Sequence, residues 1–143
     1  MENGNDIAIL TLDTNFSGPV ATLETDPSAY VTGADVTTLG WANTQVGPNP
    51  DPEQLRKVTV PLVSDSACSG SYGSDYKKGT MVCAGFEDGA KDSCDCDSGS
   101  PLVKNGRLVG VISWGHGCAK PKEYGIYARV TSFIDQINAQ LGK

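Results

Sequence analysis

Residues 91–103 read KDSCDCDSGSPLV, and this stretch decides how the rest of the chain is interpreted. It places Ser98 between Asp97 and Gly99, a few residues after Cys94. Asp, Ser and Gly are ordinary turn formers, so the tripeptide alone predicts only a turn. A serine hydroxyl is a poor nucleophile until a base takes its proton. Whether this turn carries chemistry therefore depends on what the remaining segments supply.

The composition is that of one globular domain. The chain has 143 residues, of which 38% are hydrophobic and 20% charged, and this balance indicates neither disorder nor a membrane protein. The formal charge of −6 argues against nucleic acid as a partner and favours cationic ligands. No apolar run is long enough to span a membrane, and the first residues predict no signal peptide. The five cysteines could form two disulfides and leave one thiol, or all stay reduced.

Short strands separated by turns predominate along the chain. In residues 55–63, alternation places Val58, Val60 and Leu62 on one face. Similar apolar runs predict strands in residues 5–12, 31–44, 81–86, 107–114 and 124–130. The three prolines of residues 46–54 predict an exposed loop, because proline cannot sit in a central strand. Together these features predict an all-β barrel.

Two helices are expected around this barrel. A short helix in residues 64–73 would begin at Ser64 or Asp65. A C-terminal helix would be capped by Thr131 or Ser132. It would pack one apolar stripe against the body, formed by Val130, Phe133, Ile134, Ile137 and Leu141.

In this order, the segments resemble the C-terminal half of chymotrypsin-like serine proteases, most nearly the trypsin branch. Residues 96–101 are similar to the family's G-D-S-G-G-P segment, with Cys96 and Ser100 where glycine is expected. Residues 5–10 match its N-D-I-A-x-L signature, and its G-W-G appears here as Gly-Trp-Ala at residues 40–42. The resemblance implies the second antiparallel β-barrel of a two-barrel fold, with a remnant of the first barrel and a terminal helix. It also implies hydrolysis of peptide bonds after Lys or Arg, without a cofactor or metal.

The resemblance further implies catalytic roles for particular residues. Ser98 would attack the peptide carbonyl, and Asp6 would orient the catalytic histidine. Backbone N–H groups of Cys96 and Ser98 would form the oxyanion hole. Asp97 would accept the α-ammonium that zymogen cleavage frees.

Substrate recognition is implied in the same way. The positions that match the specificity pocket and its backbone-pairing edge are Asp92, Ser93, Ser113, Trp114, Gly115 and Gly125. Asp92 at the bottom of the pocket would select Lys or Arg, because a neutral side chain would leave a buried anion unpaired. The family disulfides would join Cys68 to Cys83 and Cys94 to Cys118, with Cys96 as the free thiol.

One histidine, His116, is present in the whole sequence. The family's catalytic histidine lies upstream of the segment that contains Asp6, whereas His116 follows Trp114. We therefore expect a chain without its general base and N-terminal barrel, inactive alone unless another chain supplies that half. The expected division is residues 1–30 as barrel remnant and crossing, 31–130 as the second barrel, and 131–143 as the helix. The disulfide pattern and the family imply an extracellular location.

Three other interpretations remain open. A non-catalytic homologue would keep the cation pocket as a binding or regulatory surface. A zinc-binding domain would use three sulfurs and one imidazole, from Cys94, Cys96, Cys118 and His116. A truncated gene or an engineered half-protease would leave the strand in residues 5–12 with an exposed edge.

Overall fold

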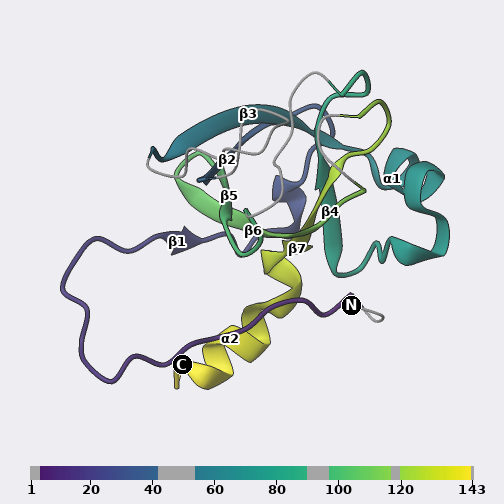
Figure 1. The fold of residues 1–143 in the computed structure, drawn as a ribbon. Coiled ribbons are helices and arrows are strands. Elements are labelled where there is room, and N and C mark those ends of the chain that lie inside the picture. Colours follow the sequence, from purple (N-terminus) through teal and green to yellow (C-terminus); the bar gives the residue numbers. More distant parts are fainter. Residues whose placement is uncertain (1–3, 42–53, 90–96, 117–119, 143) are drawn as a thin grey trace.

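The computed structural model describes residues 4–41, 54–89, 97–116 and 120–142, and at its centre is a closed β-barrel (Figure 1). Strand β6 pairs with both β5 and β7, and the neighbour order β6-β5-β2-β3-β4-β7 therefore closes on itself with antiparallel pairs throughout. The six strands are β2 (Asp35–Gly40), β3 (Arg56–Val63), β4 (Met81–Ala84), β5 (Pro101–Lys104), β6 (Arg107–Trp114) and β7 (Gly125–Arg129). A short strand β1 (Thr22–Leu23) pairs in parallel with the start of β6. The predicted all-β barrel is confirmed.

The barrel interior is filled by the apolar faces of its strands. In β3, Val60 and Leu62 are buried and Val58 is half-buried, while Lys57 and Thr59 are exposed, as the alternation predicts. The buried core cluster consists of Val36, Val60, Leu62, Val82, Ala84, Leu102, Val109, Ile112 and Tyr127. This core fixes the orientation of β6, the strand around which the candidate site is built.

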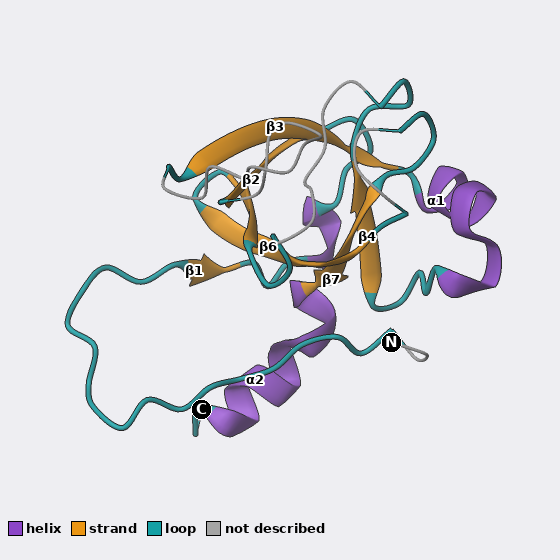
Figure 2. Cartoon of the chain, in the orientation of Figure 1, coloured by secondary structure: helices purple, strands orange, loops and turns teal. Residues whose placement is uncertain are grey.

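Helix α1 (Asp65–Tyr72) begins where the sequence predicts. The Ser64 side chain caps it by accepting a hydrogen bond from the backbone N–H of Ala67 at 3.2 Å. The buried residues Cys68 and Tyr72 face a second core cluster outside the barrel, which includes Tyr76, Met81, Cys83, Tyr124 and Ile126. Figure 2 shows α1 beside β4, on the outside of the barrel.

Helix α2 (Ile134–Gln140) follows a 3₁₀ turn at Val130–Phe133, and its predicted cap is wrong. Phe133 occupies the N-cap position without a side-chain hydrogen bond. The Ser132 side chain does not cap the helix, because its hydroxyl donates a hydrogen bond to the Gly79 carbonyl at 2.7 Å. The predicted apolar stripe is buried at Val130 and Phe133, whereas Leu141 is 53% exposed.

Strand β5 was not predicted, although a local signal for it exists. Asn105 and Gly106 connect β5 to β6, and both have left-handed φ angles, 50° and 77°. An Asn-Gly pair in this conformation is the preferred two-residue hairpin connection. The signal therefore lay in the turn rather than in the four residues of the strand.

The predicted strand in residues 5–12 is wrong. These residues form an extended arm without regular secondary structure, and Figure 1 shows the chain looping away from the barrel before it reaches β1. Leu10 and Leu12 are 86% and 65% exposed. The local sequence favours a strand, but a strand also needs a neighbour for its backbone N–H and C=O groups. None of the strands in the described part of the chain pairs with the arm.

Among the described residues, no helix is both long and apolar enough to cross a membrane.

Candidate active site

Ser98 lies on an exposed turn immediately before β5. The backbone N–H of Ser100 donates to the Asp97 carbonyl at 2.9 Å and closes this turn. Gly99 has a φ of +85°, a conformation that glycine adopts without strain. The sequence Asp-Ser-Gly thus forms a tight turn with the serine side chain at the surface.

Strand β6 holds this turn in place. The Gly99 N–H donates to the Ile112 carbonyl, and the Ile112 N–H donates to the Ser100 carbonyl, both at 2.9 Å. Ser98 lies just before this pair of bonds. Within the described residues, no acceptor contacts the backbone N–H of Ser98. That N–H can therefore donate to a bound group.

Asp6 is attached to the next residue of the same strand. The Ser113 hydroxyl donates to Asp6 Oδ2 at 2.6 Å. Ser113 is the extra residue of a β-bulge, because Ile112 pairs with Tyr127 while Trp114 already pairs with Ile126. Bulges redirect side chains. The neighbouring residues Ile112 and Ser113 therefore anchor the Ser98 turn and Asp6 to one short segment of β6.

Asp97 is buried beside the end of β2. It is 7% exposed, and among the described residues it is the one charged residue that is buried. A Cβ atom added to Gly40 would lie 1.8 Å from Asp97 Oδ1. The glycine at position 40 of the family-like Gly-Trp pair therefore has a packing reason, which the sequence alone did not reveal. Any side chain at position 40 would therefore clash with Asp97, the residue that precedes Ser98.

Among the described strands, the far end of β6 has a partner on one side only. Strand β5 pairs with β6 only as far as Val111, and the Ser98 turn occupies the following residue, Ile112. From Ser113 onward, none of the described strands pairs with β6 on the side opposite β7. Such an edge can accept an extended peptide as an added strand. Gly115 at this edge is exposed, whereas Gly125 is buried in β7 opposite Ala84.

Three aromatic side chains meet beside this edge and form what we call the aromatic surface: Tyr72, Trp114 and His116. The Tyr72 ring lies edge-on to Trp114 at 5.0 Å and to His116 at 5.1 Å between ring centroids. The Trp114 and His116 centroids are 5.5 Å apart. Sequence reasoning missed this grouping, because Tyr72 comes from α1 and no local pattern connects it to the end of β6.

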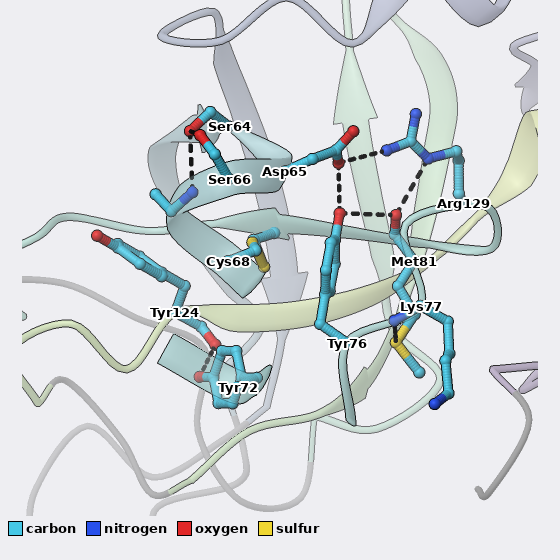
Figure 3. The surroundings of a disulfide bond; sticks show 12 residues. Ser64, Asp65, Ser66, Cys68, Tyr72, Tyr76, Lys77, Met81, Tyr124 and Arg129 are labelled. Carbon is cyan, nitrogen blue, oxygen red and sulfur yellow. Dashed lines mark hydrogen bonds and ion pairs between the residues drawn. A yellow bond between two sulfur atoms is a disulfide. The ribbon is translucent and has the colours of Figure 1, made fainter. Parts of the chain in front are cut away.

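Helix α1, which carries Tyr72, is held to the barrel by covalent and ionic contacts (Figure 3). The expected disulfide between Cys68 and Cys83 joins it to β4. At its first residue, Asp65 Oδ1 accepts hydrogen bonds from Tyr76 at 2.5 Å and from Arg129 Nη2 at 3.1 Å. Burial, with a smaller contribution from Asp65, raises the pKa of Tyr76 well above its ordinary value.

Several predicted site residues lie outside the described part of the chain. They are Asp92, Ser93, Cys94, Cys96 and Cys118, so the pocket carboxylate, one oxyanion donor, the second disulfide and three of the four candidate zinc ligands stay predictions. Among the residues that are described, no group of three or more His, Cys, Asp or Glu could hold a metal. A cavity of about 500 Å³ beside α1 contains none of the predicted site residues and is lined by Ala67, Gly70, Ser71, Glu87 and residues 121–124.

Comparison with known proteins agrees with this geometry. The family model described as Trypsin matches residues 1–137. A trypsin from Saccharopolyspora erythraea is 41% identical over 139 residues, which cover 96% of this chain and 60% of the relative. Trypsin-1 of Astacus astacus is 41% identical over 141 residues, covering 94% and 59%, and the trypsin of Sus scrofa is 38% identical over 135 residues, covering 93% and 58%. The chain thus spans about three-fifths of the length of these curated relatives. By its barrel, its serine turn and these matches, the chain belongs to the trypsin-like serine protease family.

Proposed function

We propose that this chain supplies the nucleophile, its carboxylate partner and the Lys/Arg-selective pocket of a trypsin-like serine endopeptidase. One observation carries the proposal: consecutive residues of β6 anchor the turn of Ser98, through Ile112, and the carboxylate of Asp6, through Ser113. A hydrolase of this type needs its serine and its acid held on a rigid element, because small displacements of reacting groups cost large factors in rate.

The proposed reaction is acyl transfer to Ser98. Its Oγ attacks the peptide carbonyl carbon while a histidine takes the proton, and the histidine then protonates the leaving amine. The oxyanion that develops accepts hydrogen bonds from the backbone N–H groups of Ser98 and Cys96, each worth about 3–4 kcal/mol where such donors have been removed. Water then hydrolyses the acyl group on Ser98 by the reverse sequence of proton transfers.

We infer that His116 is not the base of this reaction. Its ring packs against Tyr72 and Trp114, and Lys120 donates a hydrogen bond to its backbone carbonyl at 3.2 Å. These contacts suit a residue of the substrate-binding surface. A triad without its base loses on the order of a millionfold in rate, or about 8 kcal/mol of barrier stabilisation. The 143 residues by themselves are therefore expected to bind substrate-like cations without cleaving peptides.

The substrate in this proposal is an extended peptide with a Lys or Arg side chain. Its backbone pairs with the free edge of β6 from Ser113 onward, and its cation enters a pocket that ends at Asp92. A long basic side chain fits the role because an anion at the bottom of a pocket needs a compensating charge.

The proposed division assigns the recognition machinery to residues 31–130. Residues 1–30 contribute Asp6 and belong, by resemblance, to the first barrel and the crossing, while residues 131–143 complete the terminal helix. The Cys68–Cys83 disulfide supports an oxidising, extracellular compartment.

The test is binding of p-aminobenzamidine, a fluorescent aromatic cation, to the 143-residue chain. We expect saturable binding that Asp92→Asn abolishes. Asp13→Asn is the matched control, because it removes the same charge from the exposed arm. No binding to the unmodified chain, or equal binding to the Asp92→Asn variant, would contradict the proposed pocket. Rapid hydrolysis of an arginyl p-nitroanilide by the same sample would contradict the inference that the chain lacks a general base.

A further inference from the structure

We propose that Asn15 is an acceptor for an N-linked oligosaccharide, attached by a transferase of the secretory pathway. Residues 15–17 read Asn-Phe-Ser, and nowhere else in the sequence does serine or threonine follow an asparagine at the second position. Proline at the middle position would disqualify the motif, but Phe16 stands there. The inference goes beyond the proposed function. It rests on the extracellular location to which the family and the Cys68–Cys83 disulfide point.

The modification is a group transfer to the side-chain amide. The Nδ2 nitrogen of Asn15 attacks C1 of an oligosaccharide that is carried on a lipid pyrophosphate. The N–C1 bond forms while the C1–O bond to the pyrophosphate breaks, so the pyrophosphate leaves with the electron pair. Nδ2 gives up one proton to a base of the transferase, and nothing is oxidised or reduced. The serine hydroxyl at the third position completes the motif that the transferase recognises.

The motif lies where a large enzyme and its donor can reach it. Residues 11–17 are exposed and belong to no helix or strand. Among the described residues, no hydrogen bond or ion pair engages the Asn15 or Ser17 side chain. The Phe16 ring lies against the residue that follows the motif, since a Cβ atom added to Gly18 would be 2.3 Å from its Cζ atom. The amide of Asn15 is therefore free to react without any unfolding of the barrel.

The arm that carries the motif is attached to β6 at both ends and stands away from it in between. At one end Asp6 accepts the hydrogen bond from Ser113, and at the other β1 pairs with the start of β6. Figure 1 shows the segment between these two attachments looping away from the barrel. Asn15 belongs to this segment, so we expect an oligosaccharide on it to extend into solvent and leave the Ser98 turn uncovered.

An oligosaccharide at this position also has a physical use. Two large apolar side chains close to Asn15 are exposed to water, Phe16 to 64% and Val20 to 80%. Exposed apolar surface of this kind favours association between molecules. An N-linked oligosaccharide is bulky and solubilising, so it would cover these side chains and oppose self-association through the arm.

The experiment produces the 143-residue chain behind a secretion signal in cultured eukaryotic cells. Medium and cell lysate are treated with peptide-N-glycosidase, which removes N-linked oligosaccharides and converts the linked asparagine to aspartate. We expect most molecules to lose mass on treatment, and peptide mass spectrometry to find the new aspartate at position 15. The lysate is included because transfer precedes export, so a poorly secreted chain is still tested. Unmodified Asn15 in both fractions would overturn the inference.

Four variants isolate the motif. Ser17→Ala leaves Asn15 in place and should abolish the mass loss, as should Asn15→Gln, whereas Ser17→Thr should retain it. Asn138→Gln in α2 is the matched control, because it makes the same change outside any such motif and should keep the modification. Mass loss that persists in Ser17→Ala would overturn the inference.

Two measurements on the purified chain test the consequences. The glycosylated chain should stay monomeric to a higher concentration than the Asn15→Gln variant, and equal self-association would overturn the covering role. p-Aminobenzamidine should bind the glycosylated chain and the Ser17→Ala variant equally, and weaker binding to the glycosylated chain would contradict the placement of the oligosaccharide away from the site. Absence of binding to either form would contradict the proposed pocket and leave the assignment of Asn15 to the mass measurement.

Discussion

Replacement of Arg129 by methionine tests how α1, and therefore Tyr72, is held against the barrel. The Arg129 side chain is only 16% exposed. Its Nη2 donates to Asp65 Oδ1 and its Nε to the Met81 carbonyl, both at 3.1 Å. Its guanidinium carbon also lies 4.6 Å from the centre of the Tyr30 ring. Methionine preserves most of the aliphatic stem and removes all three contacts together. Figure 3 shows the two hydrogen bonds, to Asp65 and Met81.

The expected loss of stability can be worked out from these contacts. Hydrogen bonds to charged groups contribute about 1.5–3 kcal/mol each, and a cation over an aromatic ring about 0.5–1 kcal/mol. The Asp65 side chain is 31% exposed, so water replaces part of what it loses. We expect the Arg129→Met change to lower the free energy of unfolding by about 2–4 kcal/mol, measured by urea denaturation with the disulfide intact.

Lys78 provides a matched control, because its Nζ lies 3.9 Å from the same carboxylate while its side chain is 76% exposed. The Lys78→Met change should cost less than about 0.5 kcal/mol. In a double-mutant cycle with Asp65→Asn, Arg129 should show a coupling energy of about 1 kcal/mol or more, and Lys78 almost none. Equal losses for the two cations, or additive effects of Asp65 and Arg129, would refute the reasoning.

Three further predictions concern the same framework. Replacing Cys68 and Cys83 together by serine should lower the free energy of unfolding by about 3 kcal/mol, measured by thermal and urea denaturation; a loss below 1 kcal/mol would mean that the disulfide contributes little constraint. Burial and Asp65 raise the pKa of Tyr76, so its neutral form stabilises the fold. This stability is fully present below the ordinary tyrosine pKa near 10 and is lost as the pH rises through the raised pKa of the folded state. Absorbance at 295 nm should therefore show a late-titrating tyrosine that the Tyr76→Phe change removes, and an unchanged titration in that variant would count against this assignment. Gly40→Ala should lower the free energy of unfolding by about 1–3 kcal/mol, because the added Cβ meets Asp97. Gly70→Ala in α1, where the added Cβ meets open space, should raise it by about 0.5–1 kcal/mol. A more stable Gly40→Ala variant than Gly70→Ala variant would show that Gly40 does not pack against Asp97.

Much of the barrel could be predicted because its signals are local. The predicted ranges 55–63 and 107–114 agree with β3 and β6 to within a residue, since their alternating or continuous apolar side chains are buried by the fold itself. Residues 5–12 carry a similar local signal and yet form no strand. The amino acids of a segment determine whether it can form a strand. Whether the strand forms also depends on a neighbouring strand, and the local sequence does not show whether one is present.

The candidate site, too, could be predicted from the sequence only in part. Its motifs could be located in the sequence, because Ser98 and Asp6 lie in short recognisable segments. The contacts that position them could not, because Ile112, Ser113 and Gly40 act through distant parts of the chain. The aromatic surface was missed for the same reason: it forms only when α1 packs beside the end of β6.

The most direct test of the account is the rate at which an arginine-like phosphonate diester labels Ser98, followed by mass spectrometry of the 143-residue chain. Such reagents modify a serine only when a base activates it. The account predicts labelling many orders of magnitude slower than that of a complete trypsin-type enzyme, and the same slow rate in the His116→Gln variant. Labelling at an enzyme-like rate that His116→Gln abolishes would contradict it, because His116 would then be the base.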